Sequence, residues 1–534
     1  MSAPTGLRLV GAAALVVVLA ALPASAATTT TTTTAPSAGT SSWTVYHGDP
    51  SGDGVAGSVA SVSLTAPAWT SSALDGQLYG EPLVSSGRVY VATENDTVYA
   101  LSASNGAVAW STHVGTPVPA SALPCGDISP TVGITGTPVI DPARSEVFVV
   151  AEELVNQAPT HELIGLDTAT GKVELTQVVD PSGSTPSALL QRTGLTLDAS
   201  RVVFGYGGNF GDCSTYHGWV ESVPEAGGAA DFFQVDSGPG ESQGAIWMGG
   251  AAPVVDAGGN IWVEAGNGSV KSSSGPYDDS DSVLELSAAL ALLQYFAPAT
   301  WASENGTDLD LSTAPALLSD GQVVAGGKDR TAYLLDGAHL GGIGGEQSSL
   351  PDACGDVIDG GSAVVGTTVY LPCLQGPVAV QVSSAPAGLR VLWRSASGGG
   401  PPVVAASLVW TIGQDGVLDG LSPTTGAVVQ HANVGTPANH FPTPSVGGGL
   451  LLAPGSNRVT AFSVTSSSAA SSTTTTTRPT TTPTTARAPN TAPPPSSGGL
   501  PAWAIALIVL AAVGLGGTLV WWVRRRRSAA HPPG

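Results

Sequence analysis

The chain has 534 residues, of which 42% are hydrophobic and 11% charged, and its 40 acidic residues outnumber its 18 basic ones to give a formal net charge of −22. Nucleic-acid binding requires a basic surface, which a chain of this charge balance lacks. A strongly acidic protein instead stays soluble and repels anionic surfaces.

The first 26 residues have the features of a secretory signal peptide. Arg8 precedes an apolar run from Leu9 to Leu22, and Ala24-Ser25-Ala26 supplies a small-residue cleavage site. The alternative is an uncleaved N-terminal anchor, but the apolar run is short for a membrane span. We expect cleavage after residue 26, and the threonine-rich segment 27–42 is predicted to be disordered.

A strand-rich unit is repeated along residues 43–464, and its clearest copy begins at Gly80. Four short segments follow one another in this copy: residues 80–84, 89–92, 98–101 and, after the turn Asn105-Gly106, residues 109–110. This pattern predicts four short strands with tight turns between them. Such a unit cannot bury its own apolar face, so its copies must stack around a common axis.

Eight copies of the unit can be counted between Trp69 and Val464. Their starts lie roughly 40 to 60 residues apart, which is the period of propeller blades. Six copies open with a proline, a residue that suits the start of a strand: Pro82, Pro138, Pro253, Pro315, Pro402 and Pro444. We therefore predict an all-β, eight-bladed β-propeller, with seven blades as the alternative. A β-sandwich array or a β-helix fits regular four-strand units less well.

The last copy is one strand short, because it stops at Val464. The segment 59–69, which precedes the first copy, has a strand-like sequence and belongs to no other unit. We expect it to supply the outer strand of the last blade, so that the two ends of the propeller close the ring. Closure removes the exposed strand edges of an open sheet.

Residues 465–499 consist almost wholly of Ser, Thr, Pro and Ala. A segment of this composition cannot bury enough apolar surface to fold, and it predicts an extended stalk that is a candidate for O-glycosylation.

Residues 500–523 contain no charged side chain and are long enough to cross a bilayer as a transmembrane helix. Trp503 and Trp521-Trp522 lie at the two ends, where interfacial aromatic residues are typically found. Four arginines follow at 524–527 and predict that the tail, residues 524–534, is cytoplasmic. The expected protein is thus a single-pass protein of the cytoplasmic membrane with its propeller outside.

Four cysteines lie in the predicted extracytoplasmic part: Cys125, Cys213, Cys354 and Cys373. An even number of cysteines outside the cytoplasm favours disulfides. Because Cys354 and Cys373 are near one another in sequence, we expect them to pair, which leaves Cys125 with Cys213. Sequence alone allows three pairings, and metal binding is a further alternative, although no Cys-x-x-Cys spacing is present.

The repeat resembles that of the pyrroloquinoline-quinone-like (PQQ-like) β-propellers. Residues 81–110 carry its Pro-Leu-Val, Val-Tyr-Val-Ala and Val-Tyr-Ala-Leu segments and closing Trp, and residues 166–171 carry its Leu-Asp-x-x-Thr-Gly turn. Residues 43–50 are similar to the lead-in that such chains place before the first blade. The resemblance covers residues 43–465. It implies a propeller, and either a quinone-dependent dehydrogenase or a non-catalytic scaffold that binds partner proteins.

The catalytic parts that this resemblance would bring are not recognisable. The quinone enzymes of the family use adjacent cysteines, a calcium ion held by Glu, Asn and Asp, and a catalytic Asp, whereas no two cysteines are adjacent here. Only eleven basic residues are spread over the predicted propeller, which leaves few donors for a tricarboxylate cofactor. We therefore expect no bound cofactor, with pyrroloquinoline quinone and calcium as the alternative.

Other polar groups are given structural interpretations. The cluster at 278–281, with Asp308 and Asp310, lacks the pattern of a calcium loop and is interpreted as solvated loop. Glu152-Glu153 with His161 could suggest acid–base chemistry, but scattered histidines are more often surface or turn residues. Five tryptophans at strand positions are expected to pack between blades: Trp110, Trp219, Trp262, Trp393 and Trp410.

Three loops interrupt the repeat, at residues 157–161, 207–216 and 266–281. Insertions of this kind tend to gather on one rim, which is often the binding face. The sequence thus favours a membrane-anchored, extracytoplasmic, non-catalytic scaffold that binds a protein or cell-envelope ligand at a propeller rim. The alternative is a membrane-tethered quinone-dependent dehydrogenase.

Overall fold

The computed structural model describes residues 42–57 and 59–466, which lie within one compact unit of the chain. The predicted leader, the stalk beyond residue 466, the transmembrane helix 500–523 and the tail lie outside these residues. Within the described part, no helix is both long enough and apolar enough to cross a membrane.

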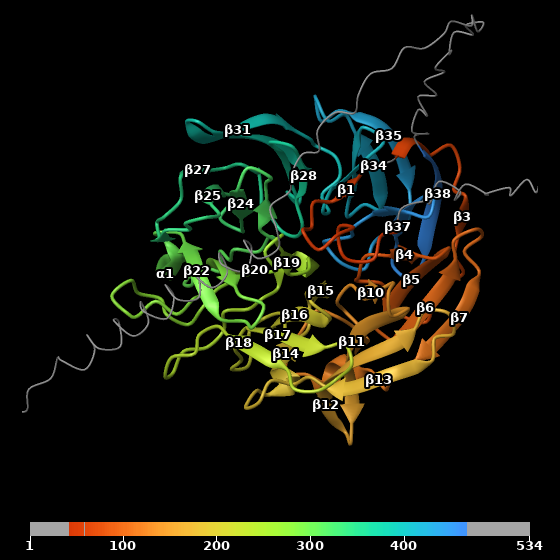
Figure 1. Cartoon of the computed structure of the whole chain (residues 1–534), viewed down its shortest axis with the longest axis horizontal. Helices are drawn as coiled ribbons and strands as arrows, with labels where there is room; N and C mark the ends of the chain where they lie inside the picture. The colour runs from red at the N-terminus through yellow and green to blue at the C-terminus, as the bar shows by residue number, and fades with distance from the viewer. Residues whose placement is uncertain (1–41, 58, 467–534) are drawn as a thin grey trace, which may run out of the picture. The chain divides into compact units, whose positions relative to one another are not determined.

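Eight β-sheets of four or five strands are arranged around a ring in chain order (Figure 1). Blade 1 contains β4 (Leu83–Ser85), β5 (Arg88–Thr93), β6 (Thr97–Ser102) and β7 (Val108–His113). Blade 2 contains β10 (Val139–Asp141), β11 (Glu146–Val155), β12 (Ala158–Asp167) and β13 (Val173–Val178). Blade 3 contains β14 (Leu189–Leu190), β15 (Thr196–Asp198), β16 (Arg201–Gly208), β17 (Trp219–Pro224) and β18 (Asp231–Gln234). Blade 4 contains β19 (Val254–Val255), β20 (Ile261–Ala265), β21 (Ser282–Leu286), β22 (Leu292–Ala297) and β26 (Gly342–Ile343).

The second half of the ring is built in the same way. Blade 5 contains β23 (Ala316–Leu317), β24 (Gln322–Gly326), β25 (Ala332–Asp336) and β27 (Ser348–Leu350). Blade 6 contains β28 (Ala363–Val365), β29 (Thr368–Leu371), β30 (Val378–Ser384) and β31 (Ala387–Arg394). Blade 7 contains β1 (Val55–Ala56), β32 (Val403–Ala405), β33 (Leu408–Ile412), β34 (Val417–Leu421) and β35 (Val428–Asn433). Blade 8 contains β2 (Val59–Ser63), β3 (Trp69–Thr70), β36 (Ser445–Gly447), β37 (Leu450–Pro454) and β38 (Val459–Ser466). The prediction of eight blades is confirmed.

A few short elements lie between the blades. They are the two-stranded pair β8 (Val118–Pro119) and β9 (Thr131–Val132), three 3-10 turns at Ala120–Ala122, Pro186–Ala188 and Met248–Gly250, and the single-turn helix α1 (Trp301–Glu304).

Burial follows the position of a strand within its blade. The second and third strands, such as β5 and β6, are buried on both faces because each blade is covered by its two neighbours. The fourth strands β7, β13 and β35 have mostly exposed or half-exposed residues, as expected of an outer edge.

Outer-strand tryptophans join two of the blades to the next blade of the ring. Trp110 of blade 1 lies on the turn at Gly171 of blade 2, where a Cβ would come within 2.5 Å of the indole, and its Nε1 donates a hydrogen bond of 3.0 Å to the Thr168 carbonyl. Trp393 of blade 6 lies in the same way on Gly426 of blade 7. The predicted packing between blades is seen directly for these tryptophans.

The ring is closed by strands from both ends of the described chain. Strand β38 pairs antiparallel with β2, with Val62 opposite Val464, and with β3, with Trp69 opposite Ala461. The prediction that segment 59–69 completes the last blade is confirmed. The last blade is thus completed by strands from the N-terminal side of the propeller, as in other closed propellers.

The lead-in, residues 43–56, runs through the inside of the ring and is hydrogen-bonded to first strands of several blades (Figure 1). Trp43 N donates to the Val84 carbonyl of blade 1 over 2.8 Å, and the Pro50 carbonyl accepts from Val255 N of blade 4 over 2.7 Å. Further along, β1 pairs in parallel with β32 of blade 7. The side chains of Tyr46 and His47 are buried and stack with ring centroids 4.4 Å apart. The ring axis is therefore filled by this segment at one end.

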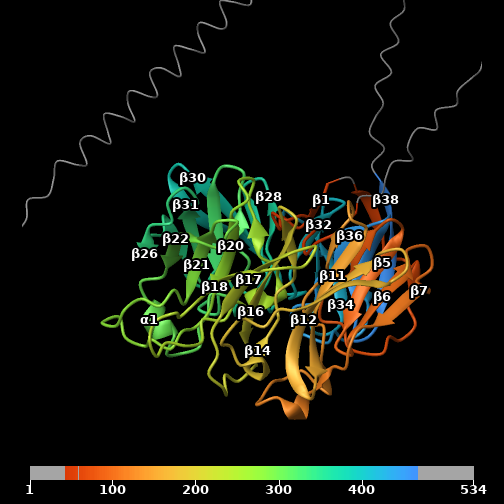
Figure 2. The ribbon, with the colours of Figure 1, turned by 60° about the horizontal axis from the view of Figure 1, so that its bottom comes forward.

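The two faces of the ring differ. Because successive strands of a blade are antiparallel, the loops between second and third strands lie on the same face as the blade-to-blade connections. We call this the insertion face, and its segments include residues 114–138, 209–218, 235–253, 266–281 and 298–315. The opposite face carries short turns, the lead-in and the end of β38 (Figure 2). In Figure 2 the turn of β11–β12 and α1 lie below, and the end of β38 lies above.

Candidate binding site

Loops of blades 1 to 4 form a connected wall on the insertion face. The β8–β9 hairpin is joined to the β16–β17 loop by the disulfide Cys125–Cys213. A bridge between Pro117 and Glu153 connects the same hairpin to the long strand β11. Next along the ring, Gly244 N donates a hydrogen bond of 2.6 Å to the Asn267 carbonyl. The predicted insertions 207–216 and 266–281 contribute to this wall. The prediction of a loop at 157–161 is wrong, because residues 158–161 belong to strand β12, which pairs with β11 across a short turn.

The second disulfide, Cys354–Cys373, joins the connection after blade 5 to the β29–β30 loop, also on the insertion face. The prediction of disulfides is thus confirmed, with the two pairs that sequence proximity favoured. Neither bond joins cysteines that are adjacent in sequence. Both fix loops to their blades, and neither is placed to act as an adjacent-cysteine pair.

Residues from the connections into several blades lie together on the insertion face near the ring axis. Arg192, ahead of β15, lies between two aromatic rings, with its Cζ 5.6 Å from the ring centroid of Tyr79 and 5.5 Å from that of Phe441. These rings come from the connections into blades 1 and 8. The turn Met248–Gly250, ahead of blade 4, and Asp359, ahead of blade 6, border the same place. We call this set the axial floor.

Arg192 is 9% exposed and forms no ion pair with any carboxylate of the described residues. Burial lowers the pKa of its guanidinium, whereas the nearby Tyr79, Glu94, Asp359 and Asp127 raise it. An arginine remains cationic in such a setting because its unperturbed pKa lies far above neutral pH. The axial floor therefore carries a positive charge that two aromatic faces hold in place.

Two buried carboxyl groups near Arg192 have raised pKa values. Burial raises the pKa of Asp359 to about 7, and its Oδ1 has no hydrogen-bond partner among the described residues. Burial also raises the pKa of Glu94 to about 7, although Glu94 Oε2 accepts a hydrogen bond of 2.8 Å from Gly133 N. Both groups are therefore partly protonated at neutral pH and neutralise Arg192 incompletely.

Lys328 is a second cation close to the axis, but it is paired. Its Nζ forms an ion pair with Asp310, lies 3.2 Å from Asp308 Oδ1 and sits 5.6 Å from the ring centroid of Trp247. Burial alone would lower the pKa of Lys328, but the charge of Asp310 outweighs it and raises the pKa. Asp310 is buried, so the prediction of a solvated loop is wrong for it but right for the exposed Asp308.

A groove of about 510 Å³ opens beside Lys328 on the insertion face. Its lining includes Phe210, Trp247, Asn267 and Lys271. Trp247 lies against Gly207, where a Cβ would come within 1.9 Å of Nε1, and it donates a hydrogen bond to the Gly208 carbonyl. These glycines allow the indole to lie flat against β16.

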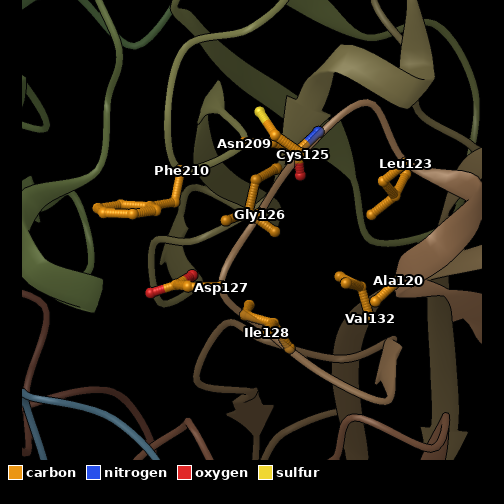
Figure 3. A pocket seen from close by; sticks show the side chains of 10 residues that line it. Ala120, Leu123, Cys125, Gly126, Asp127, Ile128, Val132, Asn209 and Phe210 are labelled. Atoms are coloured by element: carbon orange, nitrogen blue, oxygen red, sulfur yellow. The ribbon is translucent and has the colours of Figure 1, made fainter.

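Phe210 is 64% exposed, the largest exposed fraction among the large hydrophobic side chains of the described residues. It also borders a small notch beside Cys125, whose volume of about 20 Å³ holds about one water molecule. Figure 3 shows Phe210 and Asp127 projecting away from the apolar side of that notch, where Leu123, Ala120 and Val132 pack. The aromatic ring is therefore presented on a loop that the disulfide holds.

The acidic cluster at 278–281 is buried, contrary to its interpretation as a solvated loop. Asp281 is fully buried with neither oxygen hydrogen-bonded, and burial raises its pKa well above the usual value. Asp278 accepts hydrogen bonds from Ser280 and Val270. The cluster is buried because the connection after blade 3 covers it, with Asp236 N donating to the Asp278 carbonyl. Spacing along the chain gave no sign of that cover.

His161 is also buried, which corrects its interpretation as a surface or turn residue. Its Nδ1 lies 2.8 Å from Asp180 Oδ1, and its Nε2 lies 3.7 Å from Glu152 Oε2. Burial lowers the pKa of His161, but the hydrogen bond to Asp180 and the nearby carboxylate of Glu152 outweigh it and raise the pKa to about 9. The ring packs edge-on against Tyr206 of blade 3. The group is enclosed between blades 2 and 3, so it forms an internal ion-pair cluster rather than an open site.

A family model described as "Outer membrane protein assembly factor BamB", named PQQ_2, matches residues 33–270. The resemblance to the PQQ-like β-propeller repeat family is confirmed. A search of curated proteins gave no significant match to the chain.

Solved structures with a PQQ-like propeller fold are similar to the chain. Quinohemoprotein alcohol dehydrogenase from Comamonas testosteroni is 16% identical, with 79% of this chain and 80% of that chain covered and a TM-score of 0.59. Quinohemoprotein alcohol dehydrogenase ADHIIG from Pseudomonas putida HK5 is 14% identical, with 86% and 83% covered and a TM-score of 0.59. A europium-containing methanol dehydrogenase is 14% identical, with 74% and 86% covered and a TM-score of 0.53. At these identities the similarity establishes the fold and leaves the activity open.

Pyrroloquinoline quinone with calcium is the cofactor that PQQ-like propellers imply, and the axial floor does not fit it. Arg192 could bind one carboxylate, but backbone packs directly beside it: a Cβ on Gly250 would lie 2.5 Å from Nη1, and one on Gly249 would lie 2.4 Å from Asp359 Oδ1. Over residues 42–57 and 59–466, no group of three or more His, Cys, Asp or Glu side chains is arranged to hold a metal ion. The residues thus supply neither a flat open slot nor a calcium ligand set.

Arg192 and Phe210 are the two features of the site that the sequence analysis missed. Arg192 stands two residues before the glycine that opens the third copy, and Tyr79 stands one residue before the glycine that opens the first. Reading the residues just before these opening glycines together could have found the axial floor. Phe210 had a weaker signal, namely an aromatic residue in an insertion that also carries a cysteine.

Proposed function

We propose that the chain is an exported, membrane-anchored scaffold whose insertion face binds a protein or another component of the cell envelope and catalyses no reaction. The observation that carries this proposal is the disulfide-fixed wall of loops with Phe210 exposed on it. A rigid, exposed aromatic side chain loses little entropy on binding and is typical of residues that dominate interface energies. The match to a family described as an assembly factor supports the same function.

The proposed location rests on the sequence. Residues 1–26 would direct export, residues 500–523 would hold the chain in the cytoplasmic membrane, and residues 524–534 would remain in the cytoplasm. The described chain ends at Ser466 on the face opposite the insertion face. The predicted stalk, residues 465–499, therefore does not begin among the loops that we propose for binding.

Crosslinking on intact cells tests the proposal. Cells that express the full chain with a C-terminal affinity tag are treated with a membrane-impermeant crosslinker, and the adducts are purified under denaturing conditions. The proposal expects a discrete crosslinked adduct. Its yield should decrease when Phe210 is replaced by Ala and should stay unchanged when the exposed Val429 of β35 is replaced by Ala. No adduct above the level of a tag-only control would count against a scaffold.

A quinone-dependent dehydrogenase is the second candidate, favoured by Arg192 at the ring axis and by the fold shared with quinohemoprotein enzymes. Its test is addition of pyrroloquinoline quinone and Ca²⁺ to the purified chain, with alcohols and aldoses as substrates and a redox dye as acceptor. Dye reduction that needs quinone, calcium and substrate together would support the enzyme and overturn the scaffold. We expect none.

A further inference from the structure

The guanidinium of Arg192 is the unpaired cation of the axial floor. Only 9% of Arg192 is exposed, yet its guanidinium makes no ion pair with the described carboxylates. No hydrogen bond from its guanidinium to another described residue is found, and the residue keeps a small exposed fraction. Burying a guanidinium is costly unless an anion pairs with it, and cation–π contacts with Tyr79 and Phe441 offset only part of that cost.

The shape of this cation suits a carboxylate. A guanidinium presents a planar fork of donors that binds both carboxylate oxygens at once. The guanidinium lies over the rings of Tyr79 and Phe441, and these contacts limit its movement. The fork is therefore preorganised, and an arriving carboxylate would lose little free energy in ordering it.

The surroundings favour a carboxylate that belongs to a larger apolar ligand. All 40 acidic residues and only eleven basic ones lie between residues 43 and 464, so a free small anion is repelled by the domain as a whole. Tyr79 and Phe441 are half-exposed beside Arg192 and provide apolar surface. Asp127, whose charge acts on Arg192, lines the same notch as the exposed Phe210. Apolar contacts with these rings could offset the repulsion.

We propose that Arg192 is the anchor for a carboxylate presented by a segment of a partner protein, an Asp or Glu side chain with an apolar neighbour. The inference rests on the proposed scaffold function and names the chemistry of its partner. The carboxylate binds the guanidinium fork between Tyr79 and Phe441, and the apolar neighbour packs against the aromatic side chains of the insertion face.

Fluorescence anisotropy with a peptide library tests the proposal on the purified full-length chain in detergent. The probes are fluorescein-labelled octapeptides in which Asp or Glu stands beside Phe or Leu, each paired with its Asn or Gln counterpart. The expected preference is at least about tenfold for the acidic member of the tightest pair, the range of a charge-assisted hydrogen bond. Arg192→Gln abolishes that preference, Arg192→Lys weakens it, and the exposed Arg390→Gln retains it. Circular dichroism and thermal unfolding verify that each variant is folded.

Phe210→Ala provides a second variant that leaves the axial floor intact. This substitution is expected to lower the affinity for acidic and amide peptides alike by several-fold, because it removes an apolar contact and no charge. Equal binding of acidic and amide peptides, or an unchanged preference in Arg192→Gln, would overturn the proposal. So would binding of citrate or phosphate at Arg192 without binding of any acidic peptide. If Arg192→Gln were crosslinked to a partner on cells as well as the parent chain is, the scaffold function would be supported, and only the role of Arg192 as the anchor would be contradicted.

Discussion

The indole of Trp69 lies directly on Gly106, where a Cβ would come within 2.4 Å of Cε3, and its Nε1 donates a hydrogen bond of 2.8 Å to the Ala103 carbonyl. Trp69 belongs to blade 8 and Gly106 to blade 1, so this contact closes the ring. The same arrangement joins Trp110 to Gly171 and Trp393 to Gly426 between neighbouring blades. Closure thus reuses the contact that holds consecutive blades together.

Gly106→Ala should therefore weaken the closure of the ring. The new methyl would collide with Trp69 at a residue whose φ is +69°, and we expect a loss of about 2 kcal/mol or more in unfolding free energy. Gly87→Ala is the matched control, because its φ is +75° but no atom lies within 4 Å of the added Cβ. Urea denaturation of both variants separates backbone strain from the lost tryptophan contact. Equal losses would show that the Trp69 contact contributes nothing.

Trp43→Ala should destabilise the propeller from its axis. The side chain is 2% exposed, and its Nε1 donates a hydrogen bond of 3.0 Å to Glu81 Oε1, so the substitution leaves a cavity and a buried acceptor with fewer partners. We expect a loss of about 3 to 5 kcal/mol. Phe210→Ala, which removes an exposed aromatic ring, should change the unfolding free energy by less than about 0.5 kcal/mol. A small effect of Trp43→Ala would mean that the lead-in is not part of the folded core.

The two disulfides should differ in their effect on stability. Cys125–Cys213 closes a loop of 88 residues and Cys354–Cys373 one of 19, and a longer loop restricts the unfolded chain more strongly. Replacing the first pair by Ser should cost about 1 kcal/mol more than replacing the second, by the logarithmic dependence on loop length. Thermal unfolding of the two double variants under oxidising conditions provides the comparison. The reverse order would show that contacts in the folded state, rather than loop length, decide the effect.

Stability should decrease from mildly acidic to alkaline pH because of the cluster between blades 2 and 3. Burial and the charge of Asp180 raise the pKa of Glu221 to about 9, and the folded-state pKa of His161 is also about 9. Both values exceed those of the unfolded chain, so both groups favour the folded state at low pH. The stabilisation from Glu221 is fully present below about pH 4.5, and that from His161 below about pH 6.5. Both contributions to the free energy of unfolding are lost as the pH rises through about 9.

Glu221→Gln tests this pH dependence, since an amide occupies the same space without a charge. The variant should be more stable than the parent chain at pH 9 by at least about 1 kcal/mol and should show a flatter profile between pH 5 and 9. Glu174→Gln, which alters a surface ion pair with Lys172, should leave the profile unchanged. Parallel profiles of stability against pH for the parent chain and Glu221→Gln would show that Glu221 does not cause the pH dependence.

Most of the fold could be predicted from the local sequence of the repeat. Turn glycines, opening prolines and β-branched strands recur within each unit, so eight blades and the closing role of residues 59–69 could be predicted without knowledge of distant contacts. The burial of His161 and Asp281 could not be predicted in this way, because the blades and connections that cover them come from other parts of the chain. Arg192 was missed for the same reason: its partners Tyr79 and Phe441 are separated from it by more than a hundred residues on either side.

Position-resolved photocrosslinking on intact cells tests the central claim, that the insertion face binds a partner, most directly. A photoreactive phenylalanine is incorporated at position 210 on the insertion face or at position 429 on the outer strand β35, where the natural side chains are 64% and 57% exposed. The account predicts a discrete adduct from position 210 and only background from position 429. Equal yields from both positions, or an adduct from position 429 alone, would contradict it.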